Sequence, residues 1–176
     1  MISVTVEIYG HQVHQVLMRL QNALMPTGMM EFLRLHAYPH LQRRAADRFS
    51  SQGDDASGSW APLAPATLEW RTALGYDPFG PINVRSGDLQ DLVTGGTAPA
   101  FTTHGHGDIT MNYLGNMPSG DLMQALEGAQ QGGKGSPQQP ARPVLAMNER
   151  DAEMILTRMV AWLSARVTVG GSGGAV

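Results

Sequence analysis

The chain has 176 residues, of which 42% are hydrophobic and 15% charged, and its formal net charge is −3. That composition is typical of a folded protein and argues against intrinsic disorder, and the length suits a single domain. Mild acidity gives the chain no overall attraction to nucleic acid or to an anionic membrane. Cysteine is absent, which excludes disulfide bonds and thiolate chemistry.

Membrane-spanning and secretory segments are not predicted. No apolar run approaches the roughly 20 residues that cross a bilayer, and residues 1–7 lack the basic and apolar regions of a signal peptide. We therefore expect a soluble protein with no membrane partner. Glycine and proline number 21 and 11, which predicts long loops between the elements.

The N-terminal third is predicted to hold one strand and two long helices. Residues 2–9 alternate apolar and polar side chains, which is the period of a half-buried strand. Residues 11–25 form a helix whose buried apolar side chains are spaced three and four apart. These side chains are Val13, Val16, Leu17, Leu20 and Leu24. A second helix covers residues 27–50, with a kink near Tyr38 or a division into two successive helices, because Pro39 lacks an N–H group.

The middle of the chain is predicted to contain short elements. In order, these are a helix over residues 65–73, a helix capped by Ser86 that runs to residue 92 or 93, a hairpin of strands 98–103 and 108–114, and a helix over residues 119–129. Residues 130–139 are rich in glycine, glutamine, proline and serine, and a mobile loop is expected there.

The C-terminal segment begins with a predicted short strand over residues 144–147. Asn148 then caps the last helix, with Asp151 at the capping-box position three residues later. The expected buried face of this helix consists of Met154, Ile155, Met159, Trp162 and Leu163. Residues 167–169 are predicted to add an edge strand, and residues 170–176 to form a flexible glycine-rich tail.

These elements predict an α+β fold, because helices and antiparallel strands are segregated along the chain. We expect one domain over residues 1–169, in which two long N-terminal helices and a C-terminal helix pack on a small antiparallel sheet, with long loops. An edge of this sheet would remain available for strand addition by a neighbouring chain.

Residues 48–92, here called the Trp-Pro segment, are the most distinctive part of the sequence. They contain Trp60 and Trp70 and long stretches without a regular element. Such segments often carry the contacts that matter, and Trp and Pro suit anchoring because little conformational entropy is lost when they are ordered. The alternative is that Trp60 and Leu63 plug the core of the same chain.

A series of residues in this segment follows a recognisable order. Its members are Phe49, the polar turn 55–58, Trp60, Pro62, Leu63, Thr67, Ser86, Gly87 and Leu89. Further on, residues 140–145 read Pro-Ala-Arg-Pro-Val-Leu. The order and spacing over about residues 45–165 resemble those of the phage virion-morphogenesis or tail-completion family, whose usual Thr-Gly is Ser86-Gly87 here.

The resemblance implies a structural virion protein of the head–tail junction, a tail-completion or neck component without enzymatic activity or cofactor. Its copies would form a homo-oligomer, a hexameric ring that docks tail to head. Other partners would be the connector, the tail terminator or the tail tube, with genomic DNA at most passing through the lumen. The protein would reside in the virion, and in the host cytoplasm during assembly. The residues expected to bind partners are Phe49, Trp60, Pro62, Leu63, Thr67, Arg85, Gly87, Leu89, Arg142 and Pro143.

Arg142 is singled out by its neighbours as well. Pro140 and Pro143 restrict the backbone around it. A rigidly presented guanidinium group suits a bidentate contact with a carboxylate or with backbone carbonyl groups. We expect Arg142 to lock the Trp-Pro segment, or a neighbouring subunit, to the sheet.

Two other classes of function are considered. A metal-dependent hydrolase or nuclease would use His104, His106 and Asp108, which a strand would place on one side as ligands. The alternative for these residues is a solvated hairpin tip. A nucleic-acid-binding accessory protein would use Arg43, Arg44 and Arg48, which share one helix. The alternative for the arginines is the solvated face of that helix.

Overall fold

The computed structural model describes residues 10–84, 86–95, 98–104, 108–115, 120–132 and 140–168. The fold is α+β, as predicted: helices predominate, and two separate antiparallel hairpins accompany them. The strand expected over residues 2–9 and the tail expected over 170–176 lie outside the described residues. None of the helices within the described ranges is long and apolar enough to cross a membrane.

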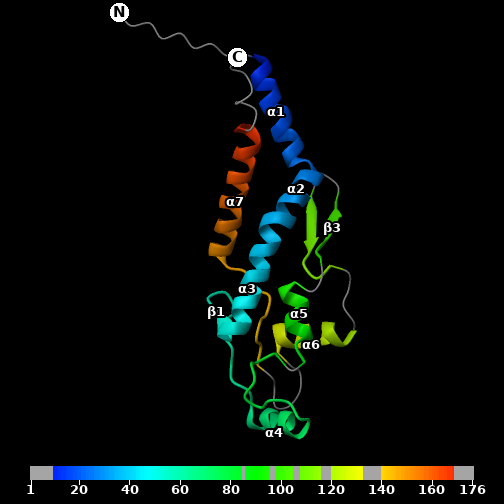
Figure 1. Cartoon of the computed structure of the whole chain (residues 1–176), viewed down its shortest axis with the longest axis vertical. Coiled ribbons are helices and arrows are strands. Elements are labelled where there is room, and N and C mark those ends of the chain that lie inside the picture. Colours follow the sequence, from blue (N-terminus) through cyan, green and yellow to red (C-terminus); the bar gives the residue numbers. More distant parts are fainter. Residues whose placement is uncertain are drawn as a thin grey trace, which may run out of the picture.

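The N-terminal helices form one bent column (Figure 1). Helix α1 covers Gly10–Leu24. Met25 follows with an extended backbone, as expected for a residue before proline, and Pro26 begins α2 (Pro26–Phe32). Helix α3 (Tyr38–Ser51) continues the column. Ala45 and Phe49 of α3 are buried, as is Ala37 just before it.

The kink expected near Tyr38 takes the form of a π-helical turn, η1 (Leu33–Ala37). The amide of Tyr38 donates to the carbonyl of Leu33, five residues back. Pro39 has no N–H group and cannot complete a regular α-helical ladder, and the wider turn before it keeps the column continuous. The residue that disturbs the helix was therefore predicted correctly, whereas a break into two separate helices does not occur.

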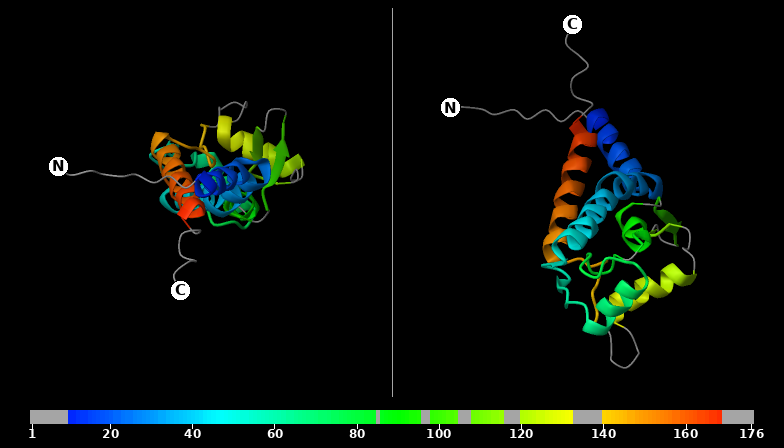
Figure 2. Two further views of the ribbon diagram at one scale, coloured as in Figure 1. Left: turned by 90° about the horizontal axis from the view of Figure 1, so that it is seen from above. Right: turned by 60° about the horizontal axis from the view of Figure 1, so that its bottom comes forward.

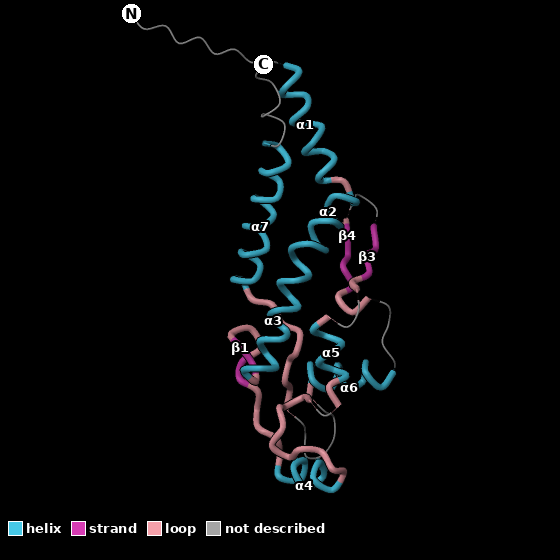
Figure 3. The backbone as a smooth tube through the Cα atoms, in the orientation of Figure 1, coloured by secondary structure: helices cyan, strands magenta, loops and turns pink. Residues whose placement is uncertain are grey.

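The strands form two hairpins and not the single sheet that was predicted. Strands β1 (Gly53–Asp54) and β2 (Gly58–Ser59) pair within the Trp-Pro segment, where only a turn was expected. Strands β3 (Ala100–Thr103) and β4 (Ile109–Asn112) pair as predicted, with Phe101 opposite Met111. Figure 3 shows the second hairpin beside α2.

The strand predicted over residues 144–147 is an irregular loop. Two of its amides are satisfied by one side chain, because Gln130 Oε1 accepts from the N–H groups of Val144 at 2.8 Å and of Leu145 at 3.2 Å. Gln130 Nε2 in turn donates to the carbonyl of Leu145 at 2.7 Å. Gln130 and Gln131 end helix α6 (Gly120–Gln131) and do not belong to the expected loop over 130–139.

The remaining helices are α4 (Pro65–Ala73), α5 (Asp88–Thr94) and α7 (Glu149–Thr168). The capping box of α7 is confirmed: Asn148 Oδ1 accepts from the amide of Asp151 at 3.0 Å, and Asp151 Oδ2 accepts from the amide of Asn148 at 3.3 Å. The residue before α5 is Gly87 and not Ser86, with a φ of 95° that favours glycine. Val167 lies within α7, so the predicted edge strand is wrong there.

The molecule is elongated, and its two ends differ (Figures 1 and 2). Helix α1 and the C-terminal end of α7 lie side by side at one end, while α4 lies at the other. The main hydrophobic core sits in the half that contains α3, α5 and α6. Its buried members are Ala45, Phe49, Trp60, Leu92, Val93, Leu126, Ala129 and Val144.

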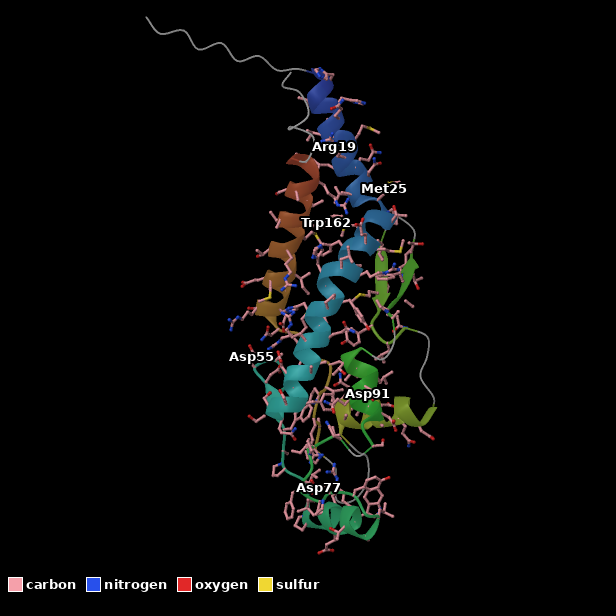
Figure 4. All side chains as sticks on the ribbon, in the orientation of Figure 1. Arg19, Met25, Asp55, Asp77, Asp91 and Trp162 are labelled. Atoms are coloured by element: carbon pink, nitrogen blue, oxygen red, sulfur yellow. The ribbon has the colours of Figure 1, made fainter. Side chains whose placement is uncertain are left out.

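The end formed by α1 and α7 is less well covered than the sequence predicts. Val13, Leu17 and Leu24 were expected to be buried and are exposed. Met154 on α7 is exposed as well. The side of α7 that does pack includes Trp162, whose ring centroid lies 5.5 Å from that of Phe32 (Figure 4).

Candidate functional site

Trp60 holds the Trp-Pro segment onto the core of the same chain. Its side chain is buried, and its ring meets the ring of Phe49 edge-on, with centroids 5.4 Å apart. The indole Nε1 donates to the carbonyl of Pro143 at 3.2 Å. The expectation that Phe49 and Trp60 contact a partner directly is therefore wrong for this conformation, because both side chains are inside.

Arg142 holds the same segment through polar contacts. Its guanidinium group is buried and donates from Nε to the carbonyl of Ala61 at 2.8 Å and from Nη2 to that of Pro62 at 2.9 Å. The backbone of Arg142 joins α6, because its amide donates to the carbonyl of Ala129 at 2.7 Å. Arg142 thus locks the Trp-Pro segment as expected, but to α6 and not to a sheet. Burial, together with the nearby charge of Arg71, lowers the pKa of Arg142.

Replacing Arg142 by alanine should lower the free energy of unfolding by about 3 kcal/mol, because two buried carbonyl groups lose charged donors. Urea denaturation followed by circular dichroism measures this loss. Arg150→Ala is the matched control, since Arg150 is exposed on the first turn of α7. Equal stability of both variants and the wild type would show that Arg142 does not hold the segment.

Arg48 is the most deeply placed charge of the described residues. Its Nη1 donates to the carbonyl of Val144 at 3.2 Å and its Nη2 to that of Ala146. Its Nε lies 2.9 Å from Asp54 Oδ2. Burial acts to raise the pKa of Asp54, but hydrogen bonds from Ser57 and Arg48 outweigh it, so the pKa lies below its ordinary value.

Arg44 extends the network along α3. Its Nη2 lies 3.0 Å from Asp54 Oδ2 and also pairs with Asp55, and its Nε lies 2.9 Å from Asp151 Oδ1. The same Asp151 oxygen lies 2.9 Å from Nε2 of the buried His40. The network joins α3, the first hairpin and the start of α7, near Asp55 in Figure 4. Arg48 is buried and Arg44 is half-buried, and both are engaged in ion pairs of the same chain, so neither is a freely solvated side chain.

A groove of about 800 Å³ collects five of the ten predicted partner-binding residues. It lies between α4, the turn before α5, and α6. Leu63, Thr67, Gly87, Leu89 and Arg142 all line it, although they come from three separate stretches of the chain. The structure therefore brings together residues that lie far apart in the sequence. Leu63 and Arg142, for example, are 79 positions apart.

The other predicted partner-binding residues that the structure describes do not line this groove. Pro62 is exposed, and the carbonyl of Pro143 accepts the hydrogen bond from Trp60. Arg85 is outside the described residues. The groove also contains residues that were not predicted, among them Trp70, Arg71, Asp121 and Gln124.

Arg71 fixes the turn that follows α4. Its side chain is buried, with Nη1 donating to the carbonyl of Gly80 at 3.2 Å and Nη2 to that of Pro81 at 3.4 Å. The turn is held at its other end by Gln52, whose Oε1 accepts from the amide of Ile82 at 2.6 Å. The loop of residues 74–81 is thereby braced to α4 and α3.

This braced loop and α4 present large apolar side chains to solvent. We call Trp70, Leu74, Tyr76 and Phe79 the α4 patch. Phe79 is 88% exposed and Trp70 is 47% exposed. The patch lies at the end of the molecule remote from α1 (Figure 1). The sequence could have indicated this patch, because Trp70 and Leu74 are four residues apart on the predicted short helix and the residue that follows it.

The described residues of the histidine hairpin are not grouped as metal ligands. His104 Nε2 lies 2.9 Å from the hydroxyl of Thr110, both side chains are exposed, and Asp108 is exposed as well. His106 lies outside the described residues. Within the ranges described, no three histidine, cysteine or acidic side chains are grouped as metal ligands.

Comparison of the chain with models of protein families, with curated proteins and with solved structures found no match.

Proposed function

We propose that the protein is a structural subunit of the phage head–tail junction, which forms a ring and docks tail to head. The α4 patch is the observation that carries this proposal: four large apolar side chains protrude from a segment that Trp60, Arg71 and Arg142 brace against the rest of the fold. The convergence of the tail-completion-like residues on one groove supports it further.

Bracing matters for docking because association costs conformational entropy. A loop that is already ordered loses less freedom when a partner covers it, so more of the gain from burying apolar area remains as affinity. Trp and Tyr are also enriched among the residues that dominate binding energy in protein interfaces. The α4 patch therefore has the chemistry of an anchor for a neighbouring protein.

The groove beside the patch determines what kind of neighbour fits. Asp88 and Asp121 line it together with Leu63 and Leu89. The guanidinium groups of Arg71 and Arg142 are directed to backbone carbonyls of the same chain. An apolar segment that carries basic side chains is the complement of such a groove. Docking of this kind requires no bond-making step.

The proposal is tested in the phage that encodes the chain. Infected-cell extracts that lack the protein should accumulate separate heads and tails, and adding the purified wild-type protein should restore joined particles. Electron microscopy and the titre of infectious particles measure both. Normal joined particles in the absence of the protein would refute the proposal.

A further inference from the structure

Helix α1 carries an apolar stripe that the described residues of its own chain leave largely exposed. Val13, Leu17, Leu20 and Leu24 follow one another at intervals of four, three and four residues. This is the spacing of the seam positions in a heptad repeat, which places all four on one side of the helix. Leu17 is 58% exposed and Leu24 is 57% exposed. We call these four residues the α1 seam.

Helix α7 carries a second stripe of the same spacing. Leu156, Val160, Leu163 and Val167 also follow at intervals of four, three and four residues. Leu156 is 58% exposed and Val160 is 63% exposed, while Leu163 and Val167 are half-buried. We call these four residues the α7 seam. It differs from the side of α7 that faces its own chain, where Trp162 contacts Phe32.

The two seams match each other in length and chemistry. Each spans 12 residues, 13–24 and 156–167, and each is made of aliphatic side chains that suit knobs-into-holes packing. Helix α1 contains no acidic residue and carries Arg19, whereas the spacing of the α7 seam continues backwards into Glu153 and Glu149. One chain therefore offers both halves of a helix–helix interface.

We propose that the α1 seam of one copy packs against the α7 seam of a second copy of this chain. A contact between two different surfaces of identical subunits is head-to-tail, and such contacts close into rings or propagate as filaments. Pairing of one seam with itself would instead leave the other seam exposed on every subunit. The inference deepens the proposed ring assembly and rests on it for the biological setting, but the contact itself is tested on the purified protein alone.

Two single variants test the contact because each blocks one seam and leaves the other intact. Leu17→Glu and Val160→Glu should both be folded, since the replaced side chains are mainly exposed. Each variant alone should self-associate at least about tenfold more weakly than the wild type, because the apolar contact is replaced by an unpaired charge. Gln15→Glu is the matched control, exposed on α1 two residues from the seam positions on either side.

Mixing the two variants gives the decisive result. The intact α7 seam of Leu17→Glu should bind the intact α1 seam of Val160→Glu, so an equimolar mixture should form a one-to-one dimer that neither variant forms alone. Sedimentation velocity over a range of concentrations measures this. A wild type that stays monomeric, as it would if another part of its own chain covered the seams, would overturn the inference. So would a mixture that behaves as the sum of its two components.

Failure of this contact and failure of the proposed function are distinguishable. If the seams pair in the purified protein but extracts lacking it still join heads to tails, then the proposed function is wrong and the contact stands. If depletion blocks joining while the seam variants associate like the wild type, then the contact is wrong and the proposed function stands.

Discussion

Arg48→Ala should lower the free energy of unfolding by about 3–5 kcal/mol, because breaking a buried ion pair is strongly destabilising and leaves Asp54 with Arg44 as its remaining ion-pair partner. In the wild type the Arg48 side chain is 1% exposed and its partner Asp54 is 8% exposed. The substitution also leaves the carbonyls of Val144 and Ala146 without their donors. We expect the largest stability loss of any single exchange at an arginine.

The pH dependence of this loss has a defined sign. The pKa of Asp54 is lowered in the native protein. The stability that the ionised carboxylate contributes is therefore fully present above the unfolded-state pKa of about 3.9, and is lost as the pH falls through the native-state pKa. The difference between wild type and Arg48→Ala should therefore be greatest above about pH 4 and shrink below it.

Urea denaturation at neutral and at acidic pH measures the difference between wild type and Arg48→Ala. Arg43→Ala serves as the control, since Arg43 is exposed on the same helix. If Arg48→Ala proved as stable as Arg43→Ala, the buried position of Arg48 would be contradicted.

Trp60→Ala should lower the free energy of unfolding by a similar amount, about 3–5 kcal/mol, because a large aromatic side chain is removed from the core. The edge-on contact with Phe49 and the hydrogen bond to Pro143 are both lost. Trp60→Phe keeps most of the ring packing but not the hydrogen bond, so a loss of about 1 kcal/mol is expected. Calorimetric or urea unfolding distinguishes the two variants.

Trp70→Ala provides the contrast for Trp60→Ala. Trp70 is 47% exposed on α4. Its replacement should lower the free energy of unfolding by well under half as much as that of Trp60, because large stability losses arise mainly at buried positions. The two tryptophans would then divide the roles that the sequence alone assigned to Trp60. Similar stability losses for both would contradict this division.

The local features of the fold were predicted well. The capping box of α7 depends only on Asn148 and Asp151, three residues apart, and both of its hydrogen bonds are present. The β3–β4 hairpin and α4 were likewise predicted from nearby residues. Pro39 identified the place where the long N-terminal helix is irregular, although not the π-helical form of the irregularity.

Features that depend on distant partners were missed. Arg48 was assigned to a solvated or phosphate-binding face because nothing near it in sequence announces the carbonyl groups of Val144 and Ala146. The strand predicted over residues 144–147 is absent because the side chain of Gln130 satisfies two amides that a neighbouring strand would otherwise bind.

The candidate site was predicted in part. The sequence order singled out Leu63, Thr67, Gly87 and Leu89, and the structure gathers these residues with Arg142 around one groove. Apolar spacing on a helix cannot distinguish a side chain buried in its own chain from one that awaits a partner. For this reason Leu17 and Leu24 were expected inside. Trp60 was favoured over Trp70 as an anchor because it belongs to the series of residues that resembles the tail-completion family.

Joining of heads to tails by a variant of the α4 patch tests the central claim most directly. The double variant Trp70→Glu/Phe79→Glu replaces two exposed side chains and should remain folded. Added to extracts that lack the protein, it should restore at least about tenfold less joining than the wild type, because the apolar anchors are lost. Leu35→Glu, an exposed apolar position outside the patch, should restore joining fully. Full restoration by the double variant would contradict the account.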